Sequence, residues 1–337
     1  MTMAFASSML NSEKTGETDF QNIASSDELV SFFSKKTIFS PFEKENVAFQ
    51  KNENLIFASD TFVVGRHFDL EDRPQDIARC MLRTSLSNMA ACGTHIKGYL
   101  MALSLPQDLD PTWLEIFKAT LIEEQNYFQL CALGGDINVT SGPLMLTFTF
   151  VGVRHIRPKI QAQLGDRIYV TGCLGDREMG HFLSQFSSAE VQKKLLEDDV
   201  EYLRIRYLLP DPHINLVQRL LPYINTCLSF SEGLIKDLTH LCSSSYLQAY
   251  IDLKSIPRSA ALQRVAQKMD LDLSDYGFTK GEDRELLFTA PLGEEDQILY
   301  LSHAFNLNTT PIGYMGLRHN MEDKAYVSWL DHDLSHT

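Results

Sequence analysis

Asp60 is the first residue of this sequence whose type and setting could do chemistry. It stands in the stretch 55–68 (LIFASDTFVVGRHF), whose two-residue period predicts a β-strand. On that strand Asp60 shares one face with four apolar residues, Ile56, Ala58, Phe62 and Val64. A half-buried carboxylate without a partner is costly, so Asp60 is expected to meet a cation, a metal ion or several N–H donors. The alternative is a carboxylate that reaches solvent at the end of the sheet.

Two clusters combine glycine with acidic residues. Gly134 and Gly135 precede Asp136, after a short buried strand expected over 131–133. They let the backbone approach a ligand, or simply form a tight turn. The stretch 171–180 (TGCLGDREMG) is a glycine-punctuated strand-to-helix turn, which offers N–H donors to an anion or is an ordinary βα turn.

Two acidic clusters stand before other elements. Ser231 and Glu232 open a predicted helix, where they fit its cap and its first turn, and capping explains both without a function. Glu282 and Asp283 precede an apolar strand in GEDRELLFT, and a solvated turn is the alternative there.

Composition limits the ligands and partners. With 337 residues, 44% hydrophobic and 22% charged, the chain is typical of a soluble globular protein with room for two domains. A formal net charge of -14 argues against a nucleic-acid partner, because phosphate backbones are held by basic patches. A phosphate-bearing ligand must therefore come with metal ions or be met by backbone amides.

The cysteines and the hydropathy pattern indicate a cytoplasmic location. The six cysteines show no CxxC spacing and no close histidines, so zinc and redox motifs are not expected. The apolar run MAFASSML lacks a basic leader, so we expect no signal peptide. No segment approaches the ~20 apolar residues that a membrane-spanning helix needs, so no membrane partner is expected.

The elements that must position these residues form an α+β pattern, because long strands occur without strict βαβ repetition. We expect strands at 55–68, 98–105, 131–133, 144–153, 167–172, 227–230, 247–253, 285–289 and 311–317. We expect helices at 26–33, from 74 to near 93, at 111–128, after 173, at 189–208, to about 221, and from 231 and 259.

The domain organisation follows from polar stretches. Residues 1–25 are Ser-rich and without periodicity, which predicts a flexible N-terminal arm. The basic stretch RHIRPKIQAQ is the candidate boundary, giving an N-terminal domain over 26–155 and a C-terminal α/β domain over 156–337.

Taken in order and spacing, these segments resemble thiamine-monophosphate kinase over roughly residues 27–317. The segments are SDTFVVGRHF, SLSNMAACG, ALSLP, GGDIN, GDRIYVTGCLGD, LSFSEGLIKDL and KGEDRELLFT. The resemblance implies the two-domain fold of the aminoimidazole ribonucleotide synthetase superfamily, with the N-terminal sheets joined into a barrel across a homodimer. It also implies transfer of the γ-phosphoryl group of ATP to thiamine monophosphate, giving thiamine diphosphate, with Mg²⁺ offsetting the phosphate charge.

The resemblance also implies roles for single residues. The metal ligands would be Glu45, Asp60, Asp136 and Glu232. ATP and phosphate would be bound by Gly134, Gly135, Thr171, Gly172, Asp176, Arg177 and Ser231. The substrate would be bound by His67, Asn88, Glu282 and Asp283.

Several positions depart from the family pattern. Lys44, Glu45 and Asn46 match the loop written GDD, Asn88 matches an Asp, and Ser229 and Glu232 match the two Asp of DLSDGL. Magnesium requires near-octahedral oxygen ligands at about 2.0–2.1 Å, so these changes alter its shell.

Basic residues enter the same motifs. Arg177 replaces Ser, Arg284 replaces Tyr, and Lys280 replaces Gly. Arg177 could contact a phosphate directly, and the alternative is that Arg177 and Arg284 are solvated surface side chains.

Two functions stay open: an active thiamine-monophosphate kinase with an altered metal shell, or a non-catalytic relative that binds a nucleotide or thiamine phosphate as a sensor. Selenophosphate synthetase is disfavoured because the first cysteine is Cys80. The carbamoyl-dehydrating maturation protein is disfavoured because the chain ends in LSHT rather than in a cysteine tail.

Overall fold

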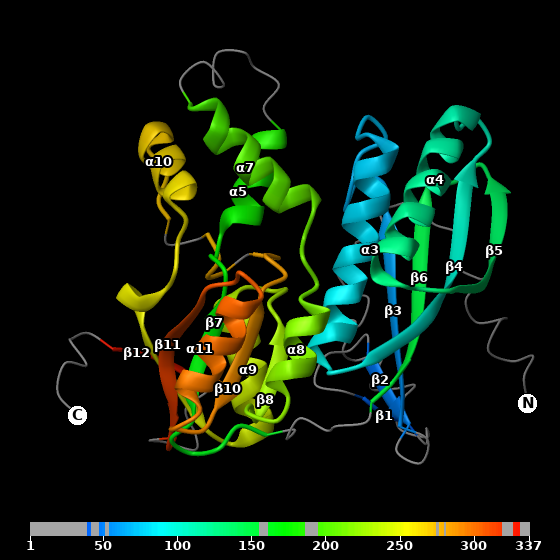
Figure 1. The fold of residues 1–337 in the computed structure, drawn as a ribbon. Coiled ribbons are helices and arrows are strands. Elements are labelled where there is room, and N and C mark those ends of the chain that lie inside the picture. Colours follow the sequence, from blue (N-terminus) through cyan, green and yellow to red (C-terminus); the bar gives the residue numbers. More distant parts are fainter. Residues whose placement is uncertain are drawn as a thin grey trace, which may run out of the picture. The chain divides into compact units, whose positions relative to one another are not determined.

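The computed structural model describes residues 54–154, 161–185, 195–273, 276–279, 281–318 and 326–330, and the backbone alone of 39–41 and 47–50. These residues belong to one compact unit, Ile38–Thr337. Figure 1 shows its two mixed β-sheets with their helices.

The first sheet has the strand order β1-β2-β3-β6-β4-β5. Its strands are β1 (Phe39–Pro41), β2 (Val47–Gln50), β3 (Leu55–Val63), β4 (His95–Pro106), β5 (Ala132–Thr140) and β6 (Met145–Val153). Neighbouring strands are antiparallel except β4 and β5, which are parallel. The expected strands at 55–68, 98–105 and 144–153 are confirmed, the first ending earlier than predicted.

Helices α3 (Pro74–Ala91) and α4 (Pro111–Phe128) cover one face of this sheet (Figure 1). Both begin as predicted, with proline in the first turn, and the Asp110 carboxylate accepts a hydrogen bond from the Thr112 amide. Between helices and sheet lies an apolar core that includes Leu82, Phe117 and Phe148. The helix α3 therefore presses its inner face against β3, the strand that carries Asp60.

Strand β5 corrects the prediction for 131–133. The strand is not short and buried but spans nine residues at the sheet edge, and all of them are exposed or half-exposed. Gly134 and Gly135 lie inside it, so the tight turn is wrong. The pairing with β4 shifts at Leu133, where Gly134 has a φ of 147°, and a Cβ on Gly135 would overlap the Met101 carbonyl. The glycines allow the backbones of β4 and β5 to come close.

The second sheet has the order β12-β9-β11-β7-β10-β8, antiparallel except for β12 and β9. Its strands are β7 (Arg167–Thr171), β8 (Thr226–Ser229), β9 (Gln248–Asp252), β10 (Leu286–Ala290), β11 (Thr309–Gly316) and β12 (Val327–Leu330). The five strands predicted at 167–172, 227–230, 247–253, 285–289 and 311–317 are confirmed, whereas β12 was not predicted.

Alternating side chains of this sheet contact helices on its two faces. Helix α9 (Leu234–Ser245) packs on the face with Ile168 and Leu287, and α8 (Ile214–Leu220) and α11 (Glu295–Ala304) pack on the face with Tyr169 and Phe288. A third cluster joins α5 (Asp176–Ser184), α7 (Glu197–Leu208) and α10 (Ala260–Met269), and a short 3-10 helix spans Leu253–Ser255.

The helices agree with the predictions in part. Those expected after 173, before 221 and from 259 are confirmed, and α11 was missed. Helix α9 begins at Leu234, so Ser231 is not its cap. Of the candidate boundary stretch 154–163, residues 155–160 lie outside the described residues, and the division into two domains stays a prediction.

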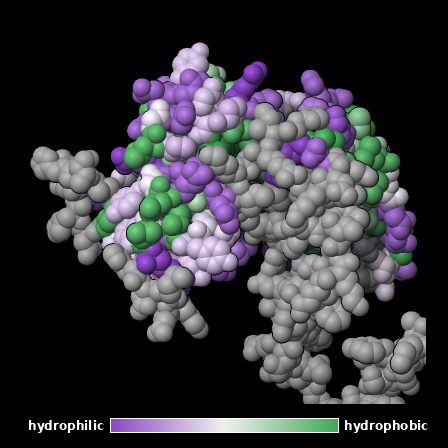
Figure 2. Space-filling view, turned by 90° about the horizontal axis from the view of Figure 1, so that it is seen from below, coloured by the Kyte–Doolittle hydropathy of each residue, from purple (hydrophilic) through white to green (hydrophobic). Residues whose placement is uncertain are grey.

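The described helices include none that is long and apolar enough to cross a membrane. On the face seen from below in Figure 2, hydrophobic residues of the described part form separate patches among hydrophilic ones.

Candidate functional site

Asp60 lies in the middle of β3, opposite Phe148 of β6, and is half-buried. The predicted partner is an amide: Nδ2 of Asn88, on α3, lies 3.5 Å from both carboxylate oxygens. Asn88 itself is 7% exposed. The alternative of a carboxylate at the end of the sheet is therefore wrong, and the structure brings two predicted site residues together.

A chain of polar contacts continues from Asn88. Its Oδ1 lies 3.5 Å from Nη1 of Arg284, and Nη2 of Arg284 donates to Oε2 of Glu282 at 3.0 Å. The same Oε2 atom accepts from Nη1 of Arg177, also at 3.0 Å. One carboxylate oxygen thus bridges two guanidinium groups.

Both arginines are buried, so the alternative that they are solvated surface side chains is wrong. Arg177 is 6% exposed and Arg284 8%. Arg177 is held from several sides: its Nε donates to the Tyr207 carbonyl at 3.2 Å, Nη1 also donates to the Glu282 carbonyl, and Nη2 lies 3.3 Å from the Cys80 sulfur. Arg284 has a left-handed backbone, with a φ of 58°, which costs a non-glycine residue about 1–2 kcal/mol.

Glu282 differs from its two partners because its side chain is 56% exposed. Partial burial raises the pKa of Glu282, but the guanidinium groups of Arg284 and Arg177 outweigh it and lower the pKa to about 2. The bridging carboxylate is therefore ionised at neutral pH.

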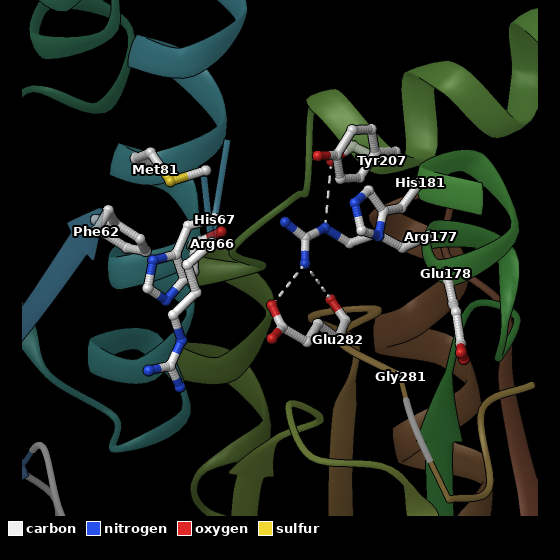
Figure 3. Close-up of a pocket in the computed structure, with 11 residues that line it drawn as sticks. Phe62, Arg66, His67, Met81, Arg177, Glu178, His181, Tyr207, Gly281 and Glu282 are labelled. Atoms are coloured by element: carbon white, nitrogen blue, oxygen red, sulfur yellow. Dashed lines mark hydrogen bonds and ion pairs between the residues drawn. The ribbon is translucent and has the colours of Figure 1, made fainter. Parts of the chain in front are cut away.

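A pocket of about 270 Å³ opens beside this carboxylate (Figure 3). Its lining comes from the β3 region, α3, α5, α7 and the loop before β10. The lining residues are Phe62, Arg66, His67, Met81, Thr84, Arg177, Glu178, His181, Tyr207, Gly281 and Glu282. Figure 3 shows Arg177 reaching toward Glu282, with aromatic and imidazole rings around them.

Two histidines of the pocket are neutral hydrogen-bonding groups at pH 7. Burial and the adjacent Arg66 lower the pKa of His67, whose Nδ1 accepts from the Val63 amide at 3.0 Å. Burial and the nearby Arg177 lower the pKa of His181, whose ring stacks on Tyr207. His67 was predicted as a substrate ligand, and the structure places it in the pocket wall.

The turn at 171–180 uses its N–H groups within the protein. The Asp283 carboxylate accepts from the amides of Gly175 at 2.7 Å and Arg177 at 2.9 Å, so it caps the N-terminus of α5. Burial raises the pKa of Asp283 to about 7, although both amides favour its charged form. An anion at this turn would have to displace Asp283.

Other predicted phosphate ligands of this turn are also engaged by protein groups. The Gly172 amide donates to the Asn308 carbonyl at 2.8 Å. The buried Asp176 carboxylate accepts from the hydroxyls of Tyr202 at 2.8 Å and Ser259 at 2.6 Å. Phosphate binding by these residues stays a prediction.

A buried cluster of charged side chains forms around Glu285, the residue that follows Arg284 in the sequence. Glu285, 1% exposed, accepts from the Thr171 hydroxyl at 2.5 Å, contacts His213 Nε2 at 3.0 Å and pairs with Arg206. Burial raises the pKa of Glu285, but His213 and Arg206 lower it to about 2. A Cβ on Gly172 would overlap this carboxylate. The sequence signal was the acid pair Asp283 and Glu285 around Arg284, but of the distant partners of Glu285 only Thr171 belongs to a motif, and His213 and Arg206 belong to none.

The predicted metal ligands do not form one group in the part of the chain that the structure describes. Asp136 is exposed on β5 and accepts from the Ile137 amide at 3.0 Å and from Asn138 Nδ2 at 2.8 Å. Glu232 lies 3.8 Å from His240 Nε2. Among the described residues no three His, Cys, Asp or Glu side chains are placed to hold a metal ion. Glu45 lies outside the described residues, as do Lys44, Asn46 and Lys280.

The remaining predicted residues are placed as follows. The Ser231 amide donates to Asp237 Oδ2 at 2.8 Å, and so does the Glu232 amide at 3.2 Å. Ser229 is buried in β8. The structure thus joins Asp60, Asn88, Arg177 and Glu282 in one network through Arg284. The role of each residue stays a prediction.

Comparison with known proteins shows which families have a similar sequence. Residues 43–154 match the family model of the AIR synthase related protein, N-terminal domain. The chain is 36% identical to thiamine-monophosphate kinase of Escherichia coli K12 over 244 residues, 72% of each chain. It is 32% identical to that of Haemophilus influenzae over 270 residues, 79% of each chain.

A solved structure, "AaThiL complexed with AMPPCP and TMP", is 25% identical, with a TM-score of 0.74 and coverage of 90% of this chain and 91% of that one. The predicted aminoimidazole ribonucleotide synthetase-like fold is therefore confirmed, whereas the barrel across a dimer stays a prediction. With a third or more of the residues identical over 72% of a curated relative, the chain belongs to the thiamine-monophosphate kinase family.

Proposed function

We propose that this protein transfers the γ-phosphoryl group of ATP to thiamine monophosphate, giving thiamine diphosphate. The observation that carries the proposal is family membership, at 36% identity over 72% of the Escherichia coli enzyme. A related solved structure, at 25% identity, is a complex with AMPPCP and TMP.

The chemistry agrees with the residues of the site. The acceptor is an anionic phosphate oxygen, so the reaction needs positioning and charge neutralisation rather than a strong base. Arg177 and Arg284 supply fixed positive charge, and the neutral His67 and His181 supply hydrogen-bonding groups in the wall of the pocket. The rings of Phe62 and Tyr207 provide an apolar surface for a heterocycle.

The proposal includes a magnesium site with fewer protein ligands than the resemblance implies. Mg²⁺ is commonly held by one or two carboxylates together with substrate phosphates and water. Asp60 is the carboxylate that fits this role in the described network, since it is half-buried on β3 and lies beside Asn88, through which the network continues to Arg284. When bound there, the ion would offset the negative charge of the ATP phosphates.

We further propose a homodimer formed through the first sheet. The edge strand β5 exposes three large apolar side chains, Leu133 at 52%, Ile137 at 59% and Val139 at 66%. A long, apolar, unprotected edge is a surface that native proteins cover by pairing.

A cytoplasmic location completes the proposal, supported by six cysteines that are all unpaired.

Thermal melting combined with product analysis tests the function. Mg-ATP and thiamine monophosphate should each stabilise the protein, by about 2.7 kcal/mol at 100 times the dissociation constant, and together they should give thiamine diphosphate. Asp60→Ala and Asp136→Ala should abolish turnover and leave the dimer intact. Binding without turnover would instead support a sensor protein.

A further inference from the structure

The contact between Arg177, Arg284 and Glu282 has the form of an occupied anion site. Oε2 of Glu282 lies 3.0 Å from Nη1 of Arg177 and 3.0 Å from Nη2 of Arg284. Two guanidinium groups that converge on one oxygen are the arrangement by which proteins bind phosphate. In this structure the oxygen belongs to a side chain of the protein.

The two sides of this contact differ in burial. The side chains of Arg177 and Arg284 are 7% and 9% exposed, whereas that of Glu282 is 56% exposed. Arg177 keeps contacts with Tyr207 and Cys80 that do not depend on the Glu282 side chain. The cations are therefore fixed in the protein, and the carboxylate can turn into solvent without opening the core.

Arg284 has N–H donors that are not fully satisfied by hydrogen bonds. Its Nε is buried and has no hydrogen-bond partner in the part of the chain that the structure describes. Its Nη1 has a long contact of 3.5 Å to Oδ1 of Asn88. A buried guanidinium donor that is left unsatisfied costs free energy that a closer anionic oxygen would recover. A phosphate, with more acceptor oxygens than a carboxylate, is suited to satisfy it.

The charge balance also favours an anion. The two arginines share one carboxylate, so the contact itself carries one net positive charge. The pocket rim adds one charge of each sign through Arg66 and Glu178, and the carboxylates of Asp69 and Asp72 also act on His181 and Tyr207. The pocket of about 270 Å³ that Arg177 and Glu282 line is large enough for a phosphate, and the rings of Phe62 and Tyr207 also line it. The ligand class is thus a phosphate monoester of a compound with an aromatic or heterocyclic part.

We propose that Arg177 and Arg284 form a phosphate site that Glu282 occupies in the free protein, and that the phosphate of a monoester substrate enters by displacing the Glu282 side chain. The assignment of that monoester as thiamine monophosphate rests on the proposed function; the phosphate site itself does not. Glu282 then acts as a built-in competitor that lowers the affinity for weak anions.

Calorimetric titration of the full chain with inorganic phosphate tests the site. Glu282→Gln removes the competing charge and should tighten phosphate binding about tenfold, and Arg284→Gln should weaken it about tenfold or more. Glu282→Asp, which keeps the charge but cannot span both arginines, should give an intermediate gain and serves if the Gln variant does not fold. Glu201→Gln, in the exposed pair with Arg204, is the matched control and should match wild type.

Phosphate affinity that is unchanged in Glu282→Gln and Glu282→Asp, or in Arg284→Gln, would overturn the proposal. The titration contains no ATP and involves no turnover. Absence of kinase activity with the expected affinity pattern would reject the proposed function alone, and intact turnover with unchanged phosphate affinities would reject this site alone.

Discussion

Replacing Glu285 by Gln should destabilise the protein strongly, because its charge neutralises two buried cations. Glu285 is 1% exposed, His213 lies within 3.0 Å of it, and Arg206 pairs with it. Removing one partner of a buried ion pair leaves an uncompensated charge and costs about 3–5 kcal/mol. At about 2–4 °C per kcal/mol, the melting temperature should fall by about 6–20 °C.

Calorimetric melting at pH 7 measures this effect, with Glu201→Gln as the control. The Glu201–Arg204 pair has the same chemistry but side chains that are 51% and 40% exposed, so its loss should cost about 1 kcal/mol or less. Because Glu285 directly follows Arg284, its variant should also weaken phosphate binding. A Glu285→Gln melting temperature within about 2 °C of the control, on the scale used above, would refute the assignment of Glu285 as the neutralising charge.

Three further predictions concern pH, the sheet edge and the Asp60 network. Burial lowers the pKa of His213, but the adjacent Glu285 outweighs it and raises that pKa above its ordinary value. The ion pair of His213 with Glu285 therefore stabilises the fold fully below the unfolded pKa of about 6.5, and this stabilisation is lost as pH rises through the folded pKa. Urea unfolding from pH 6 to pH 9 should show this loss, and His213→Gln should remove it. Gly135→Ala should overlap the Met101 carbonyl and separate β5 from β4, which light scattering would detect as loss of the dimer; an intact dimer contradicts it. Asn88→Asp places a second carboxylate beside Asp60, so the melting temperature should fall without metal and recover with Mg²⁺; equal melting in both buffers would count against it.

The sequence predicted most of the elements, although it missed α11 and β12, but it did not predict the pairing of their side chains. Alternation around Asp60 predicted β3, and proline with apolar spacing predicted α3. The same alternation required a partner for Asp60, but only the packing of α3 on β3 identifies it as Asn88. Local patterns report which face is buried, and not which residue of another element lies opposite.

Glycine positions were harder to interpret than apolar ones. Gly134 and Gly135 fitted a turn as well as a ligand contact, yet they lie in an edge strand whose backbone approaches Met101. The turn at 171–180 was recognised, but its amides are taken by Asp283 from more than 100 residues away. Sequence patterns name the donors of a turn, whereas their acceptors depend on the tertiary structure.

Arg177 and Arg284 show most clearly that burial cannot be predicted from local sequence alone. From the sequence, Arg177 was expected to contact a phosphate, and solvated surface side chains were the alternative for Arg177 and Arg284, since a single buried arginine is unfavourable. Their burial depends on the shared carboxylate of Glu282 and on Tyr207 and Asn88, which come from three separate segments.

Phosphorus NMR of the reaction mixture tests the central claim most directly. The full chain with Mg-ATP and thiamine monophosphate should produce the paired α- and β-phosphorus signals of thiamine diphosphate, together with ADP, and Asp60→Ala should produce neither. An unchanged spectrum with the wild-type chain, under conditions where calorimetry shows both substrates bound, would contradict the assignment of this protein as an active kinase.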